Sequence, residues 1–507
     1  MGAEQPPPLP SRLRDDRTMT TAKTPASVRR LLIVLGAVYL ASQLVLFSIR
    51  RPPSWDEVIY LSQVTPGVRA MMFVASRARG ITLLVAPVTI AGGSLTVVRL
   101  VLAIMSSAAL VVALLTWIPS IGIAAPIAGS FFAFSWLALL YGSEVMPNLW
   151  SAILGLTATG VFVRWLAEPD RAQPTLAGAL VGSMALMALV RPPDALVLTL
   201  SLAAYVLFFR RRAARRLPVL AAGLLLGWIP WLMEMSVRFG GPIEAFQQAV
   251  RVGPIERTGL GRTVLQHLAL TNGPTLGFAS SRAPVPIGGV MWWGGMLGLG
   301  LVAGVRTRGT RWAAPVRCAL FGGLALAAEY LLLVSGLAPR FLLPAYALLA
   351  VPAAVGAVAL TRDRSRFGRA IVWGVVVLAA FWLVWQVGTA RRIANDVTAE
   401  REGPRRVGAE LQRLAGDGRC AFESTDAFPQ IEFASHCVGG PLRTGAGAAT
   451  ALEGLASRGI AAFVVRRTPP PPELDVDPKP AATVRITGQP PWLVYEVTSS
   501  SRQGGNT

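Results

Sequence analysis

Apolar segments close in length to the ~20 residues that cross a bilayer recur along most of the 507-residue chain. Short stretches rich in Arg, Gly and Pro separate them. This pattern predicts about eleven membrane-spanning helices, and the positions of their ends are predicted to within several residues. The predicted spans are 29–49, 94–116, 120–141, 146–166, 173–190, 192–209, 217–238, 286–305, 314–336, 339–360 and 368–388.

Polar stretches make up the rest of the chain. Residues 1–28 are rich in Pro, Thr and Arg without apolar periodicity, which predicts a disordered tail. The segments 50–93 and 239–285 are expected to be large outer loops, with residues 80–93 compatible with a re-entrant piece. In the first loop, helical spacing of apolar residues predicts a helix lying in the membrane interface. The residues that carry this spacing are Val68, Met71, Met72 and Ala75.

Residues 391–507 show a different pattern, in which strand-like and helix-like segments alternate. A helix is expected over 405–414, and strands are expected at 420–424, 461–465 and 492–497. The predicted fold is therefore mainly α. It is a polytopic membrane helix bundle over residues 29–390, followed by a small α/β domain over residues 391–507.

The basic residues give the bundle a predicted orientation. The formal charge is +21, but the arginines lie in short loops between apolar runs rather than on one basic face, which argues against a nucleic-acid partner. A cytoplasmic N-terminus places the basic loops 210–216, 306–311 and 362–369 inside, as the positive-inside rule requires. An odd number of spans then makes the C-terminal domain extracytoplasmic. The Arg-, Ala- and Gly-rich composition suggests a GC-rich bacterial genome, so the expected location is the bacterial plasma membrane.

Two cysteines, Cys420 and Cys437, lie in the C-terminal domain. Outside the cytoplasm they could form a disulfide. Two free thiols fit the sequence nearly as well.

Ionisable residues gather at the predicted outer ends of the spans, where each needs a reason because charge near a bilayer is costly. They are Asp56, Glu57, Glu144, Arg191, Asp194, Glu234, Arg238 and Arg340, with Glu329 in the outer half of its span. A transporter would more naturally carry such groups near the midplane and show an internal repeat. The pattern instead indicates a polar mouth on one leaflet.

The order of several short motifs resembles the GT-C class of membrane glycosyltransferases, which includes protein O-mannosyltransferases and lipid A aminoarabinose transferases. The resemblance covers roughly residues 30–390. Its motifs are Asp56-Glu57 with Tyr60 after the first span, Arg79 to Leu84, Arg99, Glu144 to Pro147, Arg191-Pro192 and Pro339 to Tyr346. Each motif is weak by itself, so the resemblance depends on their order.

The resemblance implies transfer of a sugar from a polyprenyl-phosphate donor to an acceptor on the outer face, with inversion. It implies Asp56, with Glu57 beside it, as the catalytic carboxylate, and Arg340 as the contact of the lipid phosphate. Arg191 is a second phosphate candidate, since a guanidinium forms a fixed fork of donors that suits phosphate. Further candidates for the substrate cavity are Tyr60, Glu144, Asp194, Glu329 and Tyr346. Membrane lipid and an acceptor that is protein, lipid or polysaccharide are the expected partners.

Metal use stays open at this point. Some members of the class bind a divalent ion through carboxylates and others do not, and Asp56 with Glu144 would be the pair for Mg²⁺ or Mn²⁺ here.

The loop after the first span departs from the family pattern. Many relatives have a more polar stretch where this chain has Ser62-Gln63-Val64 and then a Met-rich segment. Acceptor contacts therefore cannot be carried over.

Plainer interpretations remain beside this one. Arg340 could simply extend to the interface, Arg77 and Arg79 fit interfacial anchors, and His267 fits a solvated loop residue. Two other functions are also compatible with the sequence. One is a carrier or flippase of a lipid-linked saccharide, and the other is a non-enzymatic envelope scaffold that presents residues 391–507.

Overall fold

The computed structural model describes residues 26–167, 173–252, 260–271, 285–333, 338–361, 366–442, 446–468 and 479–498. Nine helices of this described part are long and apolar enough to cross a membrane. They are α2 (Ala26–Leu46), α5 (Leu95–Ile121), α8 (Pro147–Ala167), α10 (Pro192–Phe209), α11 (Leu217–Arg238), α14 (Ile287–Arg306), α15 (Ala313–Ala328), α16 (Leu343–Thr361) and α17 (Arg366–Ala415). The protein is therefore a multi-pass membrane protein. The tail 1–28 lies almost wholly outside the described residues.

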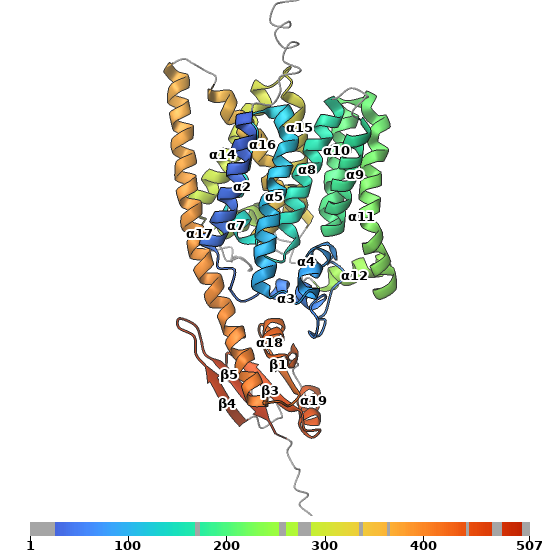
Figure 1. Ribbon diagram of the computed structural model, residues 1–507, viewed down its shortest axis with the longest axis vertical. Helices are drawn as coiled ribbons and strands as arrows, with labels where there is room; N and C mark the ends of the chain where they lie inside the picture. Colours follow the sequence, from blue (N-terminus) through green and yellow to red (C-terminus); the bar gives the residue numbers. More distant parts are fainter. Residues whose placement is uncertain are drawn as a thin grey trace, which may run out of the picture.

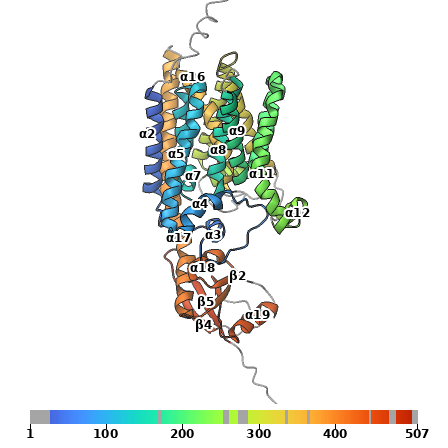
Figure 2. The same ribbon diagram turned by 45° about the vertical axis from the view of Figure 1, so that its right-hand side comes forward.

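Shorter elements complete the bundle (Figure 1). The α-helices are α3 (Trp55–Ser62), α4 (Gly80–Ile90), α6 (Ala124–Ala133), α7 (Trp136–Tyr141), α9 (Gln173–Val190), α12 (Pro242–Val252) and α13 (Leu260–Leu270). Irregular turns are η2 (Arg211–Arg216), the π-helical η3 (Glu329–Leu333) and the 3₁₀ turn η4 (Pro339–Leu342). In Figures 1 and 2, α3, α4 and α12 lie at the end of the bundle that faces the C-terminal sheet.

The span predicted over 120–141 is wrong as a single helix. The chain forms α6 and α7 instead, because Ser135 takes an extended conformation between them and its side chain accepts a hydrogen bond from the Ala138 N–H. A serine that caps a new helix in this way ends the previous one. The run 173–190 does form a helix, α9, of 18 residues.

The interface helix predicted around Met71 is also wrong. Residues 63–79 form an irregular segment, in which the Met71 backbone bonds the side chains of Ser62 and Gln63. Gly67 turns the chain with φ of 73°, a conformation that suits glycine. Met71 is buried while Met72 is 74% exposed, so the segment packs as a loop.

Close backbone approach sets the position of α4. A Cβ at Gly80 would lie 2.6 Å from the Leu189 carbonyl oxygen, at the end of α9. Only glycine fits such a contact. It brings the N-terminus of α4 beside Arg191.

Helix α17 joins the bundle to a five-stranded sheet (Figures 1 and 2). At ~1.5 Å per residue, its 50 residues extend about 75 Å. The helix expected over 405–414 is the end of α17. The predicted boundary between the bundle and the C-terminal domain, at residues 390 and 391, lies inside this helix. The strands are β1 (Cys420–Ser424), β2 (Val438–Pro441), β3 (Ala461–Arg466), β4 (Lys479–Val484) and β5 (Trp492–Val497).

The sheet is mixed, with order β2-β1-β3-β5-β4. Strand β1 pairs in parallel with β2 and β3, whereas β5 is antiparallel to β3 and β4. Helix α18 (Phe428–Ser435) connects β1 to β2 and α19 (Ala446–Ala456) connects β2 to β3. One face packs on α17 and α18 through Val407, Leu411, Phe422, Ile431 and Trp492, and the other on α19 through Leu452.

A disulfide joins Cys420 to Cys437, so the start of β1 is tied to the residue before β2. The free cysteine of the described part, Cys318, is buried in α15.

Candidate active site

Helix α3 carries the paired carboxylates, and a capping box fixes its first turn. The Ser54 hydroxyl accepts a hydrogen bond from the Glu57 N–H at 3.2 Å, and Glu57 Oε2 accepts one from the Ser54 N–H at 2.9 Å. This reciprocal pair satisfies two backbone donors that a helix N-terminus leaves open. Successive helical residues point about 100° apart, so Asp56 faces elsewhere than Glu57.

Asp56 lies between two arginines. Its Oδ1 accepts from Arg77 at 2.6 Å and its Oδ2 accepts from Arg340 of η4 at 3.0 Å. Asp56 is 8% exposed and Arg340 is 7% exposed. The Arg77 guanidinium also lies 5.1 Å from the centre of the Tyr60 ring. Arg77 is therefore a partner of Asp56 rather than an interfacial anchor.

These contacts set the charge of Asp56. Burial disfavours its ionised form, but the Arg340 and Arg77 guanidiniums outweigh that effect and hold the pKa of Asp56 below its ordinary value. The carboxylate is ionised at neutral pH. While both guanidiniums remain in place, it is a weak base.

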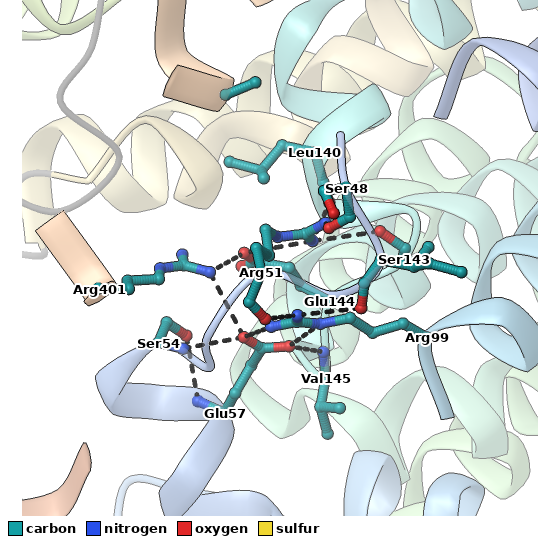
Figure 3. A network of polar contacts seen from close by, with 12 residues as sticks. Ser48, Arg51, Ser54, Glu57, Arg99, Leu140, Ser143, Glu144, Val145 and Arg401 are labelled. Carbon is teal, nitrogen blue, oxygen red and sulfur yellow. Dashed lines mark hydrogen bonds and ion pairs between the residues drawn. The ribbon is translucent and has the colours of Figure 1, made fainter. Parts of the chain in front are cut away.

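Glu57 belongs to a separate buried network (Figure 3). Its Oε2 accepts from Arg99 at 2.7 Å and lies 3.5 Å from Arg401, while its Oε1 accepts from the Val145 N–H. Glu57 is fully buried. Burial opposes ionisation, yet Arg99 and Arg401 lower the pKa of Glu57 to about 2.

Glu144 shares the same network from the turn before α8. Arg401 donates to it at 2.7 Å and Arg51 at 3.5 Å (Figure 3). Three arginines thus hold two carboxylates where α2, α5, the turn before α8 and α17 meet. Arg401 ties the long helix to the bundle at this point.

This geometry argues against two of the sequence predictions. Glu57 has no free face for a substrate, because its oxygens are taken by the helix cap, two arginines and the Val145 amide. Asp56 and Glu144 do not fit a shared divalent ion either, since each faces two guanidiniums whose charge repels a cation. No group of three or more potential metal-ligating side chains occurs within the described ranges.

Arg191 and Asp194 form a second cluster beside the first. Arg191 Nε donates to Asp194 at 3.1 Å, and Asp194 also accepts from Ser151 at 2.6 Å and from the Tyr330 hydroxyl. Arg191 also donates to Tyr330. Asp194 is completely buried, so it orients Arg191.

The Phe341 ring connects the two clusters. The guanidinium of Arg191 lies 5.6 Å from its centre and that of Arg340 lies 5.1 Å from it. Cations at this distance from a ring are attracted to it. Both phosphate candidates therefore flank one aromatic side chain.

The remaining cavity candidates are placed differently. Glu329 is buried one residue before Tyr330, and its Oε2 has no hydrogen-bond partner among the described residues. Tyr346 packs against Trp292 at 4.4 Å and Trp293 at 5.4 Å between ring centres, and its place in a substrate cavity stays a prediction.

A cavity of about 690 Å³ opens between the bundle and the α/β unit. It is lined by Trp55, Asp56 and Arg340 from the bundle side, Glu400 and Pro404 of α17, and Thr425, Asp426, Ala427, Gln430, Arg467 and Trp492 of the α/β unit. Asp56 and Arg340 thus face a common space that is large enough for a small saccharide.

Several site residues escaped the sequence analysis. No local sequence pattern pointed to Arg51, Arg401 or Tyr330, because the residues that they contact are distant in sequence. Arg79 pairs with Glu234 at 2.6 Å, so it links the segment between α3 and α4 to α11. His267 is buried in α13 rather than solvated, because the apolar face of that helix turns inward.

Comparisons of the fold with solved structures give consistent neighbours. The apo structure of ArnT from Cupriavidus metallidurans has a TM-score of 0.65 and 14% identity, covering 92% of this chain and 98% of ArnT. The undecaprenyl phosphate complex of the same protein also has a TM-score of 0.65 and 14% identity, with coverage of 94% and 99%. The oligosaccharyltransferase AglB from Archaeoglobus fulgidus, in complex with an inhibitory peptide and a dolichol-phosphate, has a TM-score of 0.53 and 12% identity, covering 86% of this chain and 69% of AglB.

The chain has the GT-C fold. The fold predicted from the sequence is confirmed, namely a mainly α membrane helix bundle of GT-C type with a small C-terminal sheet. No protein-family model matches the sequence, and no curated protein sequence matches it significantly.

Proposed function

We propose that the protein transfers a sugar from a polyprenyl-phosphate donor to a hydroxyl group of an acceptor, with inversion, at the outer face of a bacterial plasma membrane. The observation that carries this proposal is the meeting of Asp56 with Arg340 at the mouth of one cavity. A carboxylate can take a proton from the attacking hydroxyl, and a guanidinium can hold the departing phosphate. The undecaprenyl phosphate bound to ArnT and the dolichol-phosphate bound to AglB support the choice of donor.

The proposed reaction is a single displacement. The acceptor oxygen attacks the anomeric carbon as its proton passes to Asp56, and the bond between that carbon and the phosphate oxygen breaks. Polyprenyl phosphate leaves with the electron pair of that bond. Attack opposite the leaving group inverts the anomeric centre.

The arginines have a further role in this scheme. Arg77 and Arg340 bond Asp56 and weaken it as a base. A donor phosphate competes for the same guanidiniums. When it draws them away, the basicity of Asp56 rises just as the donor comes into place.

The isoprenoid chain has a candidate path beside η3. An apolar groove of about 390 Å³ runs between α13, α14 and α15, and its lining includes Leu331 and Leu332. These residues follow Tyr330, the partner of Arg191. The groove therefore reaches the residues next to Tyr330, which bonds the second phosphate candidate.

Reconstitution tests the proposal. Wild-type protein in liposomes is given a panel of labelled undecaprenyl-phosphate sugars together with hydroxyl acceptors, namely methyl glycosides, a serine-containing peptide and a hydroxyl-bearing lipid. It is expected to release undecaprenyl phosphate and form a labelled glycoside with one of these acceptors, and Asp56→Asn is expected to do neither. Passage of the lipid-linked sugar across the bilayer without a new glycosidic bond would instead identify a flippase. Activity that depends only on residues 391–507 would identify a scaffold.

A further inference from the structure

The parallel half of the C-terminal sheet has a switch in strand order. From β1 the chain runs through α18 to β2 on one side, and then through α19 to β3 on the other side of β1. In open α/β sheets the connections on either side of such a point diverge, which leaves a crevice outside the carboxyl ends of the strands. Ligands bind there in many unrelated proteins.

The cavity beside Asp56 lies at this crevice. Thr425, Asp426 and Ala427 directly follow β1, and Arg467 directly follows β3. All four line the same space as Asp56 and Arg340. The carboxyl ends of two parallel strands therefore form the wall that faces the catalytic carboxylate.

Backbone geometry fixes this wall. Ala427 has φ of 53° and ψ of 23°, a left-handed conformation that is costly for a residue with a Cβ. The Ser424 hydroxyl donates to the Asp426 carbonyl at 2.7 Å and accepts from its N–H at 3.3 Å. Such strained turns concentrate at ligand sites.

The side chains of the wall suit a polyhydroxylated ligand. Asp426 is an exposed carboxylate that can accept hydroxyl hydrogen bonds, and Arg467 supplies donors from above the Trp492 ring, 4.4 Å from its centre. Gln430 Oε1 is buried without a hydrogen-bond partner among the described residues. Trp55 adds a second indole at the edge of the cavity, and indoles pack well on the C–H faces of sugar rings.

We propose that the crevice at the carboxyl ends of β1 and β3 binds the acceptor, and that the acceptor is a saccharide. Asp426, Gln430 and Arg467 hold its hydroxyl groups and turn one of them toward Asp56. These are specificity-determining residues, because they touch the acceptor without taking part in proton transfer. The assignment of the ligand as acceptor rests on the proposed function.

Binding without turnover tests the crevice. Full-length protein in detergent is titrated with a panel of methyl glycosides and disaccharides by saturation-transfer NMR, and separately with undecaprenyl phosphate. At least one saccharide is expected to bind wild-type protein. Asp426→Asn and Arg467→Gln are expected to weaken it about tenfold or more, since each removes a charged hydrogen bond. Their affinity for undecaprenyl phosphate is expected to stay unchanged.

Matched controls lie near the amino-terminal ends of the same two strands, β1 and β3. Asp417 precedes β1 and Arg458 precedes β3, and both are exposed. Asp417→Asn and Arg458→Gln are expected to bind the saccharide within about twofold of wild type, well below the change that a lost charged hydrogen bond causes. Gel filtration and the oxidised state of Cys420 and Cys437 show whether each variant is folded.

Three results would overturn the inference: no saccharide binds, Asp426→Asn and Arg467→Gln bind it as wild type does, or serine- and threonine-containing peptides bind the crevice in its place. Failure of the proposed function has a different signature. In that case the saccharide binds and depends on Asp426, while undecaprenyl phosphate does not bind.

Discussion

The Arg340 guanidinium lies 3.0 Å from the Asp56 carboxylate, although 284 residues separate them in the chain. Arg77 bonds the other oxygen of the same carboxylate. The proposed base and the arginine proposed to bind the donor phosphate are therefore hydrogen-bond partners of each other.

Replacing the carboxylate by its amide tests the base. Asp56→Asn keeps the shape of the side chain but cannot take a proton, so the transfer rate is expected to fall ~10²- to 10⁴-fold. Transfer from an undecaprenyl-phosphate sugar in liposomes measures this. Asp396→Asn, at an exposed position of α17, should retain full activity. Full transfer by Asp56→Asn would exclude Asp56 as the base.

Arg340→Lys tests the phosphate contact. Lysine keeps the positive charge but lacks the fork of donors, so affinity for undecaprenyl phosphate is expected to fall about tenfold. Equilibrium binding to the purified protein measures the change. Arg391→Lys is the control, because Arg391 is exposed on α17. Equal affinity in both variants would assign Arg340 to the interface alone.

Glu57 is expected to stabilise the fold rather than react. Glu57→Gln leaves Arg99 buried without its counter-charge and leaves Arg401 with Glu144 alone, which should destabilise the protein by about 3–5 kcal/mol. Glu410→Gln removes an exposed pair with Arg413 and should change stability far less, because solvent screens exposed ion pairs. Thermal unfolding in detergent compares the two. Similar unfolding temperatures would contradict the structural role.

The same residue predicts an acid limit to stability. The folded-state pKa of Glu57, about 2, lies below the ordinary value of ~4.3. Its stabilisation is therefore fully present above about pH 4.3 and is lost as the pH falls toward 2. Unfolding midpoints measured across this range should decline less steeply for Glu57→Gln than for wild type. Parallel declines would assign the acid sensitivity to other groups.

The pH dependence of turnover tests the exchange of partners at Asp56. In the free protein Arg340 and Arg77 keep the pKa of Asp56 low, so kcat/KM should hold at acidic pH. When the donor phosphate draws these guanidiniums away, the pKa of Asp56 rises. Since kcat reports the bound complex, its acid limb should lie at higher pH than that of kcat/KM. Coincident limbs would mean that the guanidiniums stay on Asp56.

Local patterns predicted much of the architecture. Spans such as 146–166 and 192–209 match α8 and α10 within a residue or two, and the three predicted strands all occur. Each depends on the hydrophobicity of adjacent residues, which the sequence displays directly. The predicted helices around Met71 and Ser135 were wrong because side chains hydrogen-bond the backbone there. Hydrophobic spacing gives no information on such bonds.

Hydrophobic spacing along the chain was enough to predict a membrane helix bundle with a small α/β unit, and the residue order alone shows that an acidic pair follows the first span. Which member of that pair faces the cavity became known from the folded arrangement. Asp56 meets Arg340 there, whereas Glu57 is enclosed by Arg99 and Arg401. The physical reason is that a carboxylate's role depends on its charged neighbours. These come from helices far along the chain, as with Arg401 and Glu144, 257 residues apart.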